Sequence, residues 1–239
     1  MSDDTLMKKL MKLFGAVIFC VVNCFFSPNT YAQNTIEIAG RNYIIPAFEQ
    51  MVLQTKNGDF EGVTPIEQSK NNLEIRFSFF VATGKAMIAI RGDMDSLWAD
   101  CYFYEFPSLQ KRDPTFSIEQ FTTSRGYQMS MVSKRLDLTN GTDSIVAILL
   151  ENEIFTLDDE NVVLDSLKKN NIPFKNDPWL DGSWGTDFII KVNSQYRRFS
   201  IKPEIDSQNP SMEVFAKRIR LYNLFYGMYR SSRLPVPMW

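Results

Sequence analysis

The sequence contains no histidine among its 239 residues. Histidine is the general base of Ser-His-Asp and Cys-His catalytic sets, and it is a ligand in most catalytic zinc sites. Its absence excludes these nucleophile mechanisms and every metal site that needs an imidazole. Any catalysis by this chain must use carboxylates, lysine, tyrosine or an oxygen-ligated metal.

An excess of one charge is also lacking, because 26 basic residues stand against 28 acidic ones and the formal net charge is −2. Binding to nucleic acid depends on many lysine and arginine side chains that face phosphates. We therefore expect no nucleic acid among the partners. The 19 Phe and 9 Tyr residues favour half-buried strands instead.

A hydrophobic run long enough to cross a bilayer is lacking as well. Residues 13–26 are nearly all apolar, but a membrane-spanning helix needs about 20 apolar residues. Three lysines precede this run, and residues 27–32 follow it with a proline and a small-x-small ending. These features predict a signal peptide over residues 1–32, cleavage before Gln33, and a bacterial periplasmic or secreted protein.

Cys20 and Cys24 raise the alternative of a lipid-anchored protein. Lipidation requires a small residue before the cysteine, and Phe19 and Asn23 stand there, so we expect no lipid. Only Cys101 then remains, and a single thiol closes no internal disulfide. Since Cys101 lies on the apolar face of an alternating segment, we expect an inert core cysteine.

Alternation of polar and apolar residues predicts a mainly antiparallel sheet. The polar, proline-flanked stretch near 107–115 marks a possible sub-lobe boundary within a single domain over residues 33–239. The continuous apolar run 144–150 has no clear period, and its β-branched content favours a buried strand. The other expected strands cover residues 35–38, 43–45, 73–81, 86–91, 97–106, 116–122, 127–133, 187–193 and 196–202.

Three helices are expected, over residues 46–56, 158–170 and 209–229. The last has apolar stripes too wide for a surface helix, so we expect it to pack on the sheet. The residues expected to bury there are Phe215, Ile219, Tyr222 and Leu224. Helices and hairpins without regular strand-helix alternation predict an α+β fold.

The C-terminal part of the sequence is similar to the hairpin-then-helix ending of many small exported bacterial proteins of unknown activity. The resemblance covers about the last quarter of the chain and implies a fold element only. It is carried by Asp181-Gly182, Phe188, Tyr196-Arg197-Arg198-Phe199, Pro203, Asn209-Pro210 and Phe215.

The segment 177–187 combines two tryptophans with several carboxylates. It is not an EF-hand loop, because Trp179 and Phe188 stand at positions three and twelve, where calcium needs oxygen ligands. Indole rings stack on sugars, which makes Trp179 and Trp184 candidate ligand-binding residues. The alternative is a loop that these tryptophans anchor on the core.

Hydrolysis of a glycan without histidine requires two carboxyl groups roughly 5 to 9.5 Å apart across a cleft. Two Ser-x-x-Lys matches, at 108–111 and 166–169, lack the companion motifs of penicillin-recognising enzymes and are expected by chance. No motif indicates a metal or cofactor. The candidate acids are Asp93, Asp95, Glu151, Glu153, Asp177, Asp181 and Asp187.

Basic residues concentrate in residues 188–239, whereas acids concentrate in residues 143–187. The two regions either neutralise each other or leave a basic face for anionic lipid headgroups, an acidic glycan or an acidic partner. The residues of such a face are Arg197, Arg198, Arg218, Arg220, Arg230 and Arg233, of which the first four are candidate ligand-binding residues.

The sequence favours an exported, non-enzymatic binding or interaction protein whose partner is an envelope protein or a glycan. This interpretation rests on the export signal and on the lack of a usable catalytic set. The alternative is a histidine-free hydrolase that acts on glycans through two of the candidate acids.

Overall fold

The structure is a computed structural model that describes residues 33–48, 62–81, 84–105, 116–123, 126–175 and 186–234. By its contacts the chain divides into two units, Met1–Gln33 and Asn34–Trp239. Apart from Gln33, every described helix and strand belongs to the second unit. The expected signal peptide, the boundary near 107–115 and the 177–185 segment with both tryptophans lie outside the described residues.

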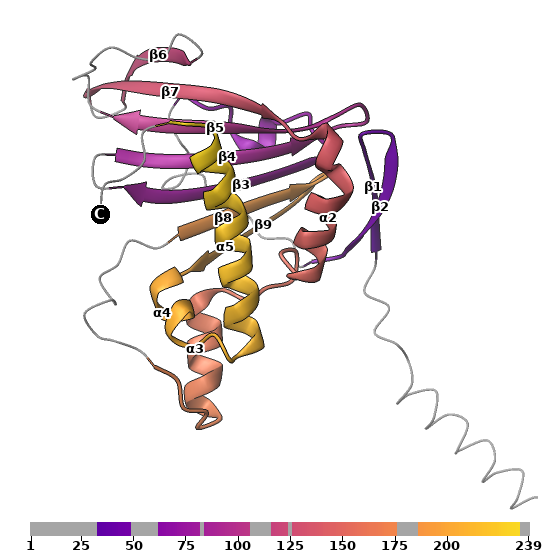
Figure 1. The fold of residues 1–239 in the computed structure, drawn as a ribbon, viewed down its shortest axis with the longest axis vertical. Helices are drawn as coiled ribbons and strands as arrows, with labels where there is room; N and C mark the ends of the chain where they lie inside the picture. Colours follow the sequence, from indigo (N-terminus) through magenta and orange to yellow (C-terminus); the bar gives the residue numbers. More distant parts are fainter. Residues whose placement is uncertain are drawn as a thin grey trace, which may run out of the picture. The chain divides into compact units, whose positions relative to one another are not determined.

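Nine strands in the described residues form two antiparallel sheets (Figure 1). A two-stranded hairpin precedes a seven-stranded sheet of order β6-β7-β5-β4-β3-β8-β9. All strands expected from alternation are present, with the exception of 144–150. Their bounds are β1 Gln33–Ile38, β2 Arg41–Pro46, β3 Leu73–Val81, β4 Gly84–Gly92, β5 Leu97–Glu105, β6 Ser117–Thr122, β7 Gln128–Asp137, β8 Thr186–Val192 and β9 Gln195–Ile201.

Within the described ranges four α-helices accompany these strands, and the expected α+β class is confirmed. The described part of the expected helix 46–56 is not helical, because Pro46 ends β2 and residues 47–48 have no regular structure. The helices are α2 Thr142–Glu151, α3 Glu160–Lys169, α4 Pro203–Gln208 and α5 Glu213–Ser231, with short 3₁₀ turns η1 Ile66–Gln68 and η2 Thr139–Gly141.

The prediction of a buried strand over 144–150 is wrong, because these residues belong to α2. The buried side chains of α2 are Thr142, Ile145, Val146 and Leu149, a spacing of three and four residues. One face of a helix recurs at this spacing, whereas a strand buries every second residue. Burial of one helical face therefore outweighs the strand preference of the β-branched residues.

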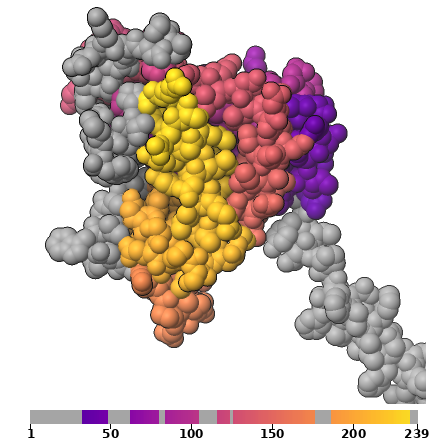
Figure 2. All heavy atoms as spheres, in the orientation of Figure 1, coloured from indigo at the N-terminus to yellow at the C-terminus, as the bar shows by residue number. Residues whose placement is uncertain are grey.

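The helices α5 and α2 cover one face of the seven-stranded sheet, as Figures 1 and 2 show. Beneath α5, the Phe77 ring lies 5.1 Å from the Phe225 ring and 4.8 Å from the Phe188 ring. Cys101 is fully buried in the same core, as expected. Burial raises the pKa of its thiol to about 12, which keeps the sulfur protonated and unreactive.

Two features of α5 differ from expectation. Phe215 is buried, but it packs with residues of α3 and α4 in a second cluster, and Ile219, Tyr222 and Leu224 are only half-buried. The side chains that α5 buries completely are Phe215, Arg218, Leu221, Phe225 and Tyr229. The helix is therefore rotated relative to the expected stripe, and an arginine occupies an interior position.

Arg218 is tolerated in the interior because two acids surround it. Its guanidinium pairs with Glu160 of α3 and lies 3.7 Å from the Asp206 carboxylate of α4. It also donates a hydrogen bond to the main-chain carbonyl of Asp158. Burial and the neighbouring Glu160 raise the pKa of Asp206 to about 8, although Arg218 opposes the shift.

This buried triad makes stability depend on pH. The folded-state pKa of Asp206 lies above its ordinary value near 3.8, so the folded state holds a proton that the unfolded state releases. The free energy of unfolding should then fall as pH rises from about 4 through 8. We expect Asp206→Asn to flatten this profile and to be more stable than wild type at pH 9, by roughly 2 to 5 kcal/mol.

Urea titrations at pH 5, 7 and 9 measure the effect, with Asp165→Asn on the exposed side of α3 as the matched control. Glu160 shifts in the same direction, since burial raises its pKa, and Glu204 adds to the shift of Asp206. Identical pH profiles for wild type and Asp206→Asn would contradict this assignment.

Candidate functional site

The face of the sheet opposite the helices carries charged side chains in rows across the central strands. The strand register places Arg91 of β4 beside Glu74 of β3, and Glu74 beside Lys191 of β8. On the other side, Asp100 of β5 pairs with Arg135 of β7. Alternation along each strand, which buries phenylalanine and isoleucine against the helices, directs these residues to the opposite face.

Several of these charges are buried, although they lie outside the apolar core. The exposed fractions are 0% for Glu74, 3% for Arg76, 6% for Asp100 and 5% for Lys191. Segment 62–72 covers part of this face. Lys191 holds it there by donating hydrogen bonds to the carbonyls of Ser69 and Asn71, at 2.8 and 2.7 Å.

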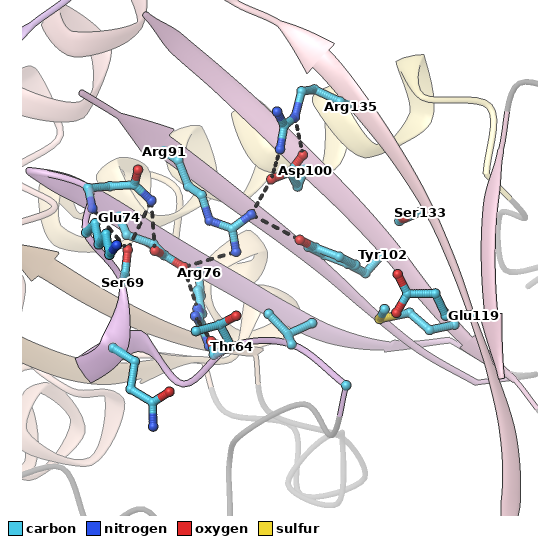
Figure 3. A pocket seen from close by; sticks show the side chains of 16 residues that line it. Thr64, Ser69, Glu74, Arg76, Arg91, Asp100, Tyr102, Glu119, Ser133 and Arg135 are labelled. Atoms are coloured by element: carbon cyan, nitrogen blue, oxygen red, sulfur yellow. Dashed lines mark hydrogen bonds and ion pairs between the residues drawn. The ribbon is translucent and has the colours of Figure 1, made fainter. Parts of the chain in front are cut away.

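Five of the charged residues form a continuous series that we call the ion-pair ladder: Arg76, Glu74, Arg91, Asp100 and Arg135 (Figure 3). Glu74 Oε1 accepts a hydrogen bond from Arg76 Nε at 2.8 Å and lies 3.2 Å from Arg91 Nη2. Arg91 Nη1 continues the ladder to Asp100, and Asp100 Oδ1 accepts from Arg135 Nε at 2.7 Å. Each carboxylate thus lies between two guanidinium groups.

Glu74, at the centre of the buried part of the ladder, stays ionised at neutral pH. Burial alone opposes ionisation of Glu74, but Arg76 and Arg91 together outweigh it and hold the pKa of Glu74 below its usual value. Burial raises the pKa of Tyr102, whose hydroxyl accepts a hydrogen bond from Arg91 Nη1 at 3.0 Å. A carboxylate locked between two arginines is a poor proton donor, so the ladder is suited to binding rather than to acid catalysis.

A cavity of about 470 Å³, which we call the ladder cavity, lies over this face (Figure 3). Its lining includes the whole ladder, Tyr102, and Thr64 and Ser69 of the covering segment. At one end the lining becomes apolar at Val63 and Met131. The cavity thus joins a fixed set of charges to a small apolar surface, a combination typical of ligand sites.

Arg76 has a hydrogen-bond donor that the described residues do not use. Its Nε donates to Glu74 and its Nη2 to the carbonyl of Thr64. The remaining nitrogen, Nη1, is buried and has no hydrogen-bond partner among the described residues. Buried polar groups nearly always have a partner, and among the described residues that line the cavity Arg76 is the one with such an unpaired side-chain atom.

A second cavity, of about 410 Å³, adjoins the first at Arg135, which lines both. Trp98 lines this second cavity, and its Nε1 donates a hydrogen bond to Asp100 Oδ2 at 3.1 Å. The Arg135 guanidinium lies 5.2 Å from the centre of the Trp98 ring, within the range of a cation-π contact. Arg135 therefore connects the ladder to Trp98, which with Tyr102 supplies the aromatic rings among the described residues that line these two cavities.

The five described candidate acids do not form a catalytic pair. Asp93 stabilises the turn between β4 and β5, where its Oδ1 accepts hydrogen bonds from the backbone nitrogens of Asp95 and Ser96. The others lie elsewhere, with Glu151 and Glu153 at the end of α2 and Asp187 on β8.

Two of these acids are already paired. Glu153 pairs with Lys217 at 2.7 Å, and Asp187 pairs with Arg198 at 2.9 Å. None of the cavities at the ladder, at Trp98 and between α2 and α5 is lined by two of the described candidate acids. Asp177 and Asp181 lie outside the described residues.

The four arginines proposed as a ligand-binding face contact other parts of the protein. The prediction that Arg218 contributes to a surface is wrong, because it is 0% exposed and neutralised by Glu160. Arg197 donates to the carbonyls of Phe155 and Leu157, and Arg198 pairs with Asp187.

Arg220 is half exposed and is also engaged. It donates to Asn152 Oδ1 at 2.6 Å and pairs with Glu213 at 3.1 Å. Internal neutralisation, the alternative interpretation of the uneven charge distribution, therefore accounts for Arg198, Arg218 and Arg220, whereas main-chain carbonyls hold Arg197. Trp179 and Trp184 lie outside the described residues, and their role stays a prediction.

The ladder residues were not selected from the sequence. Glu74 and Arg76 occupy the polar positions of an alternating strand, which is the usual pattern of a solvent-facing side. The sequence does contain one indication of the ladder. Charges of both signs occupy the polar positions of three consecutive strands, with Arg91 on β4 and Asp100 on β5 after Glu74 and Arg76 on β3.

Comparison with known proteins gives no further indication. No family model matches the chain, and searches of curated proteins and of solved structures found no match either. Within the described ranges, no group of three or more Cys, Asp or Glu residues is placed to hold a metal ion. In the same ranges no helix is long and apolar enough to cross a membrane.

Proposed function

We propose that this protein is an exported, non-enzymatic binding protein of the bacterial periplasm or cell surface and that the ladder cavity is its binding site. The observation that supports the proposal is the ion-pair ladder itself. Moving charges out of water is costly, and apolar residues of similar size often stabilise a fold at least as well. Five charged residues that line a cavity are therefore better explained by ligand binding than by stability.

The ladder also has the rigidity that a binding site requires. Each guanidinium group is held by at least one carboxylate, and Arg76 is held in addition by the Thr64 carbonyl. Side chains fixed before binding lose little conformational entropy when a ligand arrives. The ion pairs of Glu74 with Arg76 and Arg91 lower its pKa and make it a poor proton donor, which supports binding over hydrolysis.

Export is proposed from the sequence features of residues 1–32, namely the lysine cluster, the short apolar run and the small-x-small ending. A protein with these features meets envelope glycans and envelope proteins. We propose one of these as the source of the ligand.

Substitution of the exposed end of the ladder tests this proposal. Arg135→Glu reverses a charge that is 66% exposed and lines both cavities. We expect an envelope component retained by the immobilised wild-type protein to be retained at least roughly tenfold less by Arg135→Glu, because the substitution breaks the ion pair with Asp100 and places a second carboxylate beside it at the mouth of the site. Quantitative mass spectrometry or glycan analysis of the retained fraction measures the change.

Lys168→Glu is the matched control, because it makes the same change of charge on an exposed part of α3. It should retain the component as wild type does. Equal retention by wild type and both variants would contradict the assignment of the ladder cavity as the binding site.

A further inference from the structure

We propose that the ladder cavity binds an oxyanion, the carboxylate or phosphate group of a small ligand, and that Arg76 Nη1 is the principal donor to it. The inference rests on the proposed function, since it specifies the chemical class of ligand that the same site takes. It is carried by the charge of the ladder and by the unused donor of Arg76.

The ladder is not electrically neutral. It contains three guanidinium groups and only two carboxylates. Lys70 also lines the cavity, and Lys191 lies beside Glu74 on the neighbouring strand β8. The remaining acid of the described lining, Glu119, is exposed on the outermost strand β6. The inner part of the cavity therefore carries an excess of positive charge, which attracts an anion and disfavours a cation.

Arg76 provides a directed donor for that anion. Two of its three nitrogens are already bonded, to Glu74 and to the Thr64 carbonyl, so the plane of the guanidinium is fixed. The third, Nη1, is buried without a partner among the described residues. A hydrogen bond from a buried guanidinium to an anionic oxygen is charge-assisted and is strengthened by the low local dielectric.

The neighbouring groups of the cavity explain why one oxyanion fits better than a neutral polar group. Arg91 and Arg135 are each bonded to Asp100, so they contribute positive charge but have fewer free donors. A neutral ligand would gain one hydrogen bond from Arg76 and nothing from this charge. An anion gains both.

Titration of the purified protein with sodium phosphate and with sodium acetate, followed by amide NMR, tests the inference. Sodium chloride at equal ionic strength controls for screening. We expect saturable shifts of amides in residues 62–72 and in β3 and β4 with at least one of the two oxyanions and not with chloride. Tighter binding of phosphate or of acetate then identifies which oxyanion the ligand carries.

Variants assign the donor. Arg76→Gln should raise Kd at least roughly tenfold, the loss expected for one charge-assisted hydrogen bond. Arg198→Gln is the matched control, because Arg198 lies on β9, pairs with Asp187 and does not line the cavity. Its Kd should stay within about twofold of wild type.

Arg76→Gln removes a partner of buried Glu74 and is expected to lower stability. If that variant does not fold, Arg135→Gln decides, with Kd raised by roughly three- to tenfold through lost charge. Unsaturable shifts that match those with chloride, or an unchanged Kd in the folded cavity variants, would overturn the inference. Saturable shifts of the same amides with glucose, and with neither oxyanion, would also overturn the oxyanion inference. Such a result would still support the ladder cavity as a binding site. Failure of the proposed function gives a different result: the immobilised wild-type protein and the Arg135→Glu variant would then retain the envelope component equally.

Discussion

Replacing Glu74 with glutamine should lower the free energy of unfolding by roughly 3 to 5 kcal/mol. Glutamine keeps the shape of the side chain and removes its charge, which leaves Arg76 and Arg91 without their shared carboxylate. Glu74 is fully buried, so water cannot replace the lost partner. The midpoint of thermal unfolding should fall by about 6 to 20 °C in a domain of this size.

Glu119→Gln is the matched control for this experiment. Glu119 lines the same cavity, but it is exposed on β6. The identical chemical change should therefore alter the free energy of unfolding by less than about 0.5 kcal/mol. Urea denaturation of the three proteins measures both effects, and equal stabilities would show that the ladder charges are solvated rather than buried.

Replacing Phe77 with alanine should cost about 3 to 5 kcal/mol. Phe77 lies at the centre of the core between the sheet and α5, with the rings of Phe188, Phe225 and Tyr222 at 4.8, 5.1 and 5.8 Å. Truncation removes these contacts and leaves a cavity that the two rigid layers cannot close. Calorimetry should show a large decrease in the unfolding midpoint.

Tyr127→Ala serves as the control for this prediction, because the Tyr127 side chain is 59% exposed. Its removal should change stability by less than about 0.5 kcal/mol. A loss for Phe77→Ala as small as that for Tyr127→Ala would mean that α5 and the sheet do not share this dense core.

Much of the sheet could be predicted from the sequence because strand alternation is a local signal. Residues 73–79 alternate strictly between apolar and polar residues, and the strand expected over 73–81 has the bounds of β3. The run 144–150 misled the prediction because its six consecutive apolar residues, 145–150, fit either period. Only the neighbouring elements, which bury one face of α2, decide between a helix and a strand.

The candidate site could not be predicted in the same way because it depends on the pairing of distant strands. Glu74 and Arg91 are partners across a hairpin, but Asp100 meets Arg135 through a pairing that spans 35 residues. The sequence also gave no sign that segment 62–72 covers this face. The prediction that Arg218 lies on a basic surface was wrong for a related reason, because its partner Glu160 lies 58 residues away in the sequence.

Hydrogen exchange of the protein with and without the retained envelope component tests the central claim most directly, because it locates the binding site without substitution. If the component binds in the ladder cavity, amide exchange should slow in residues 62–72, β4 and β5 and should stay unchanged in α2 and α5. Slower exchange confined to α2 and α5, with the cavity segments unaffected, would contradict the account and place the binding site on the helical face.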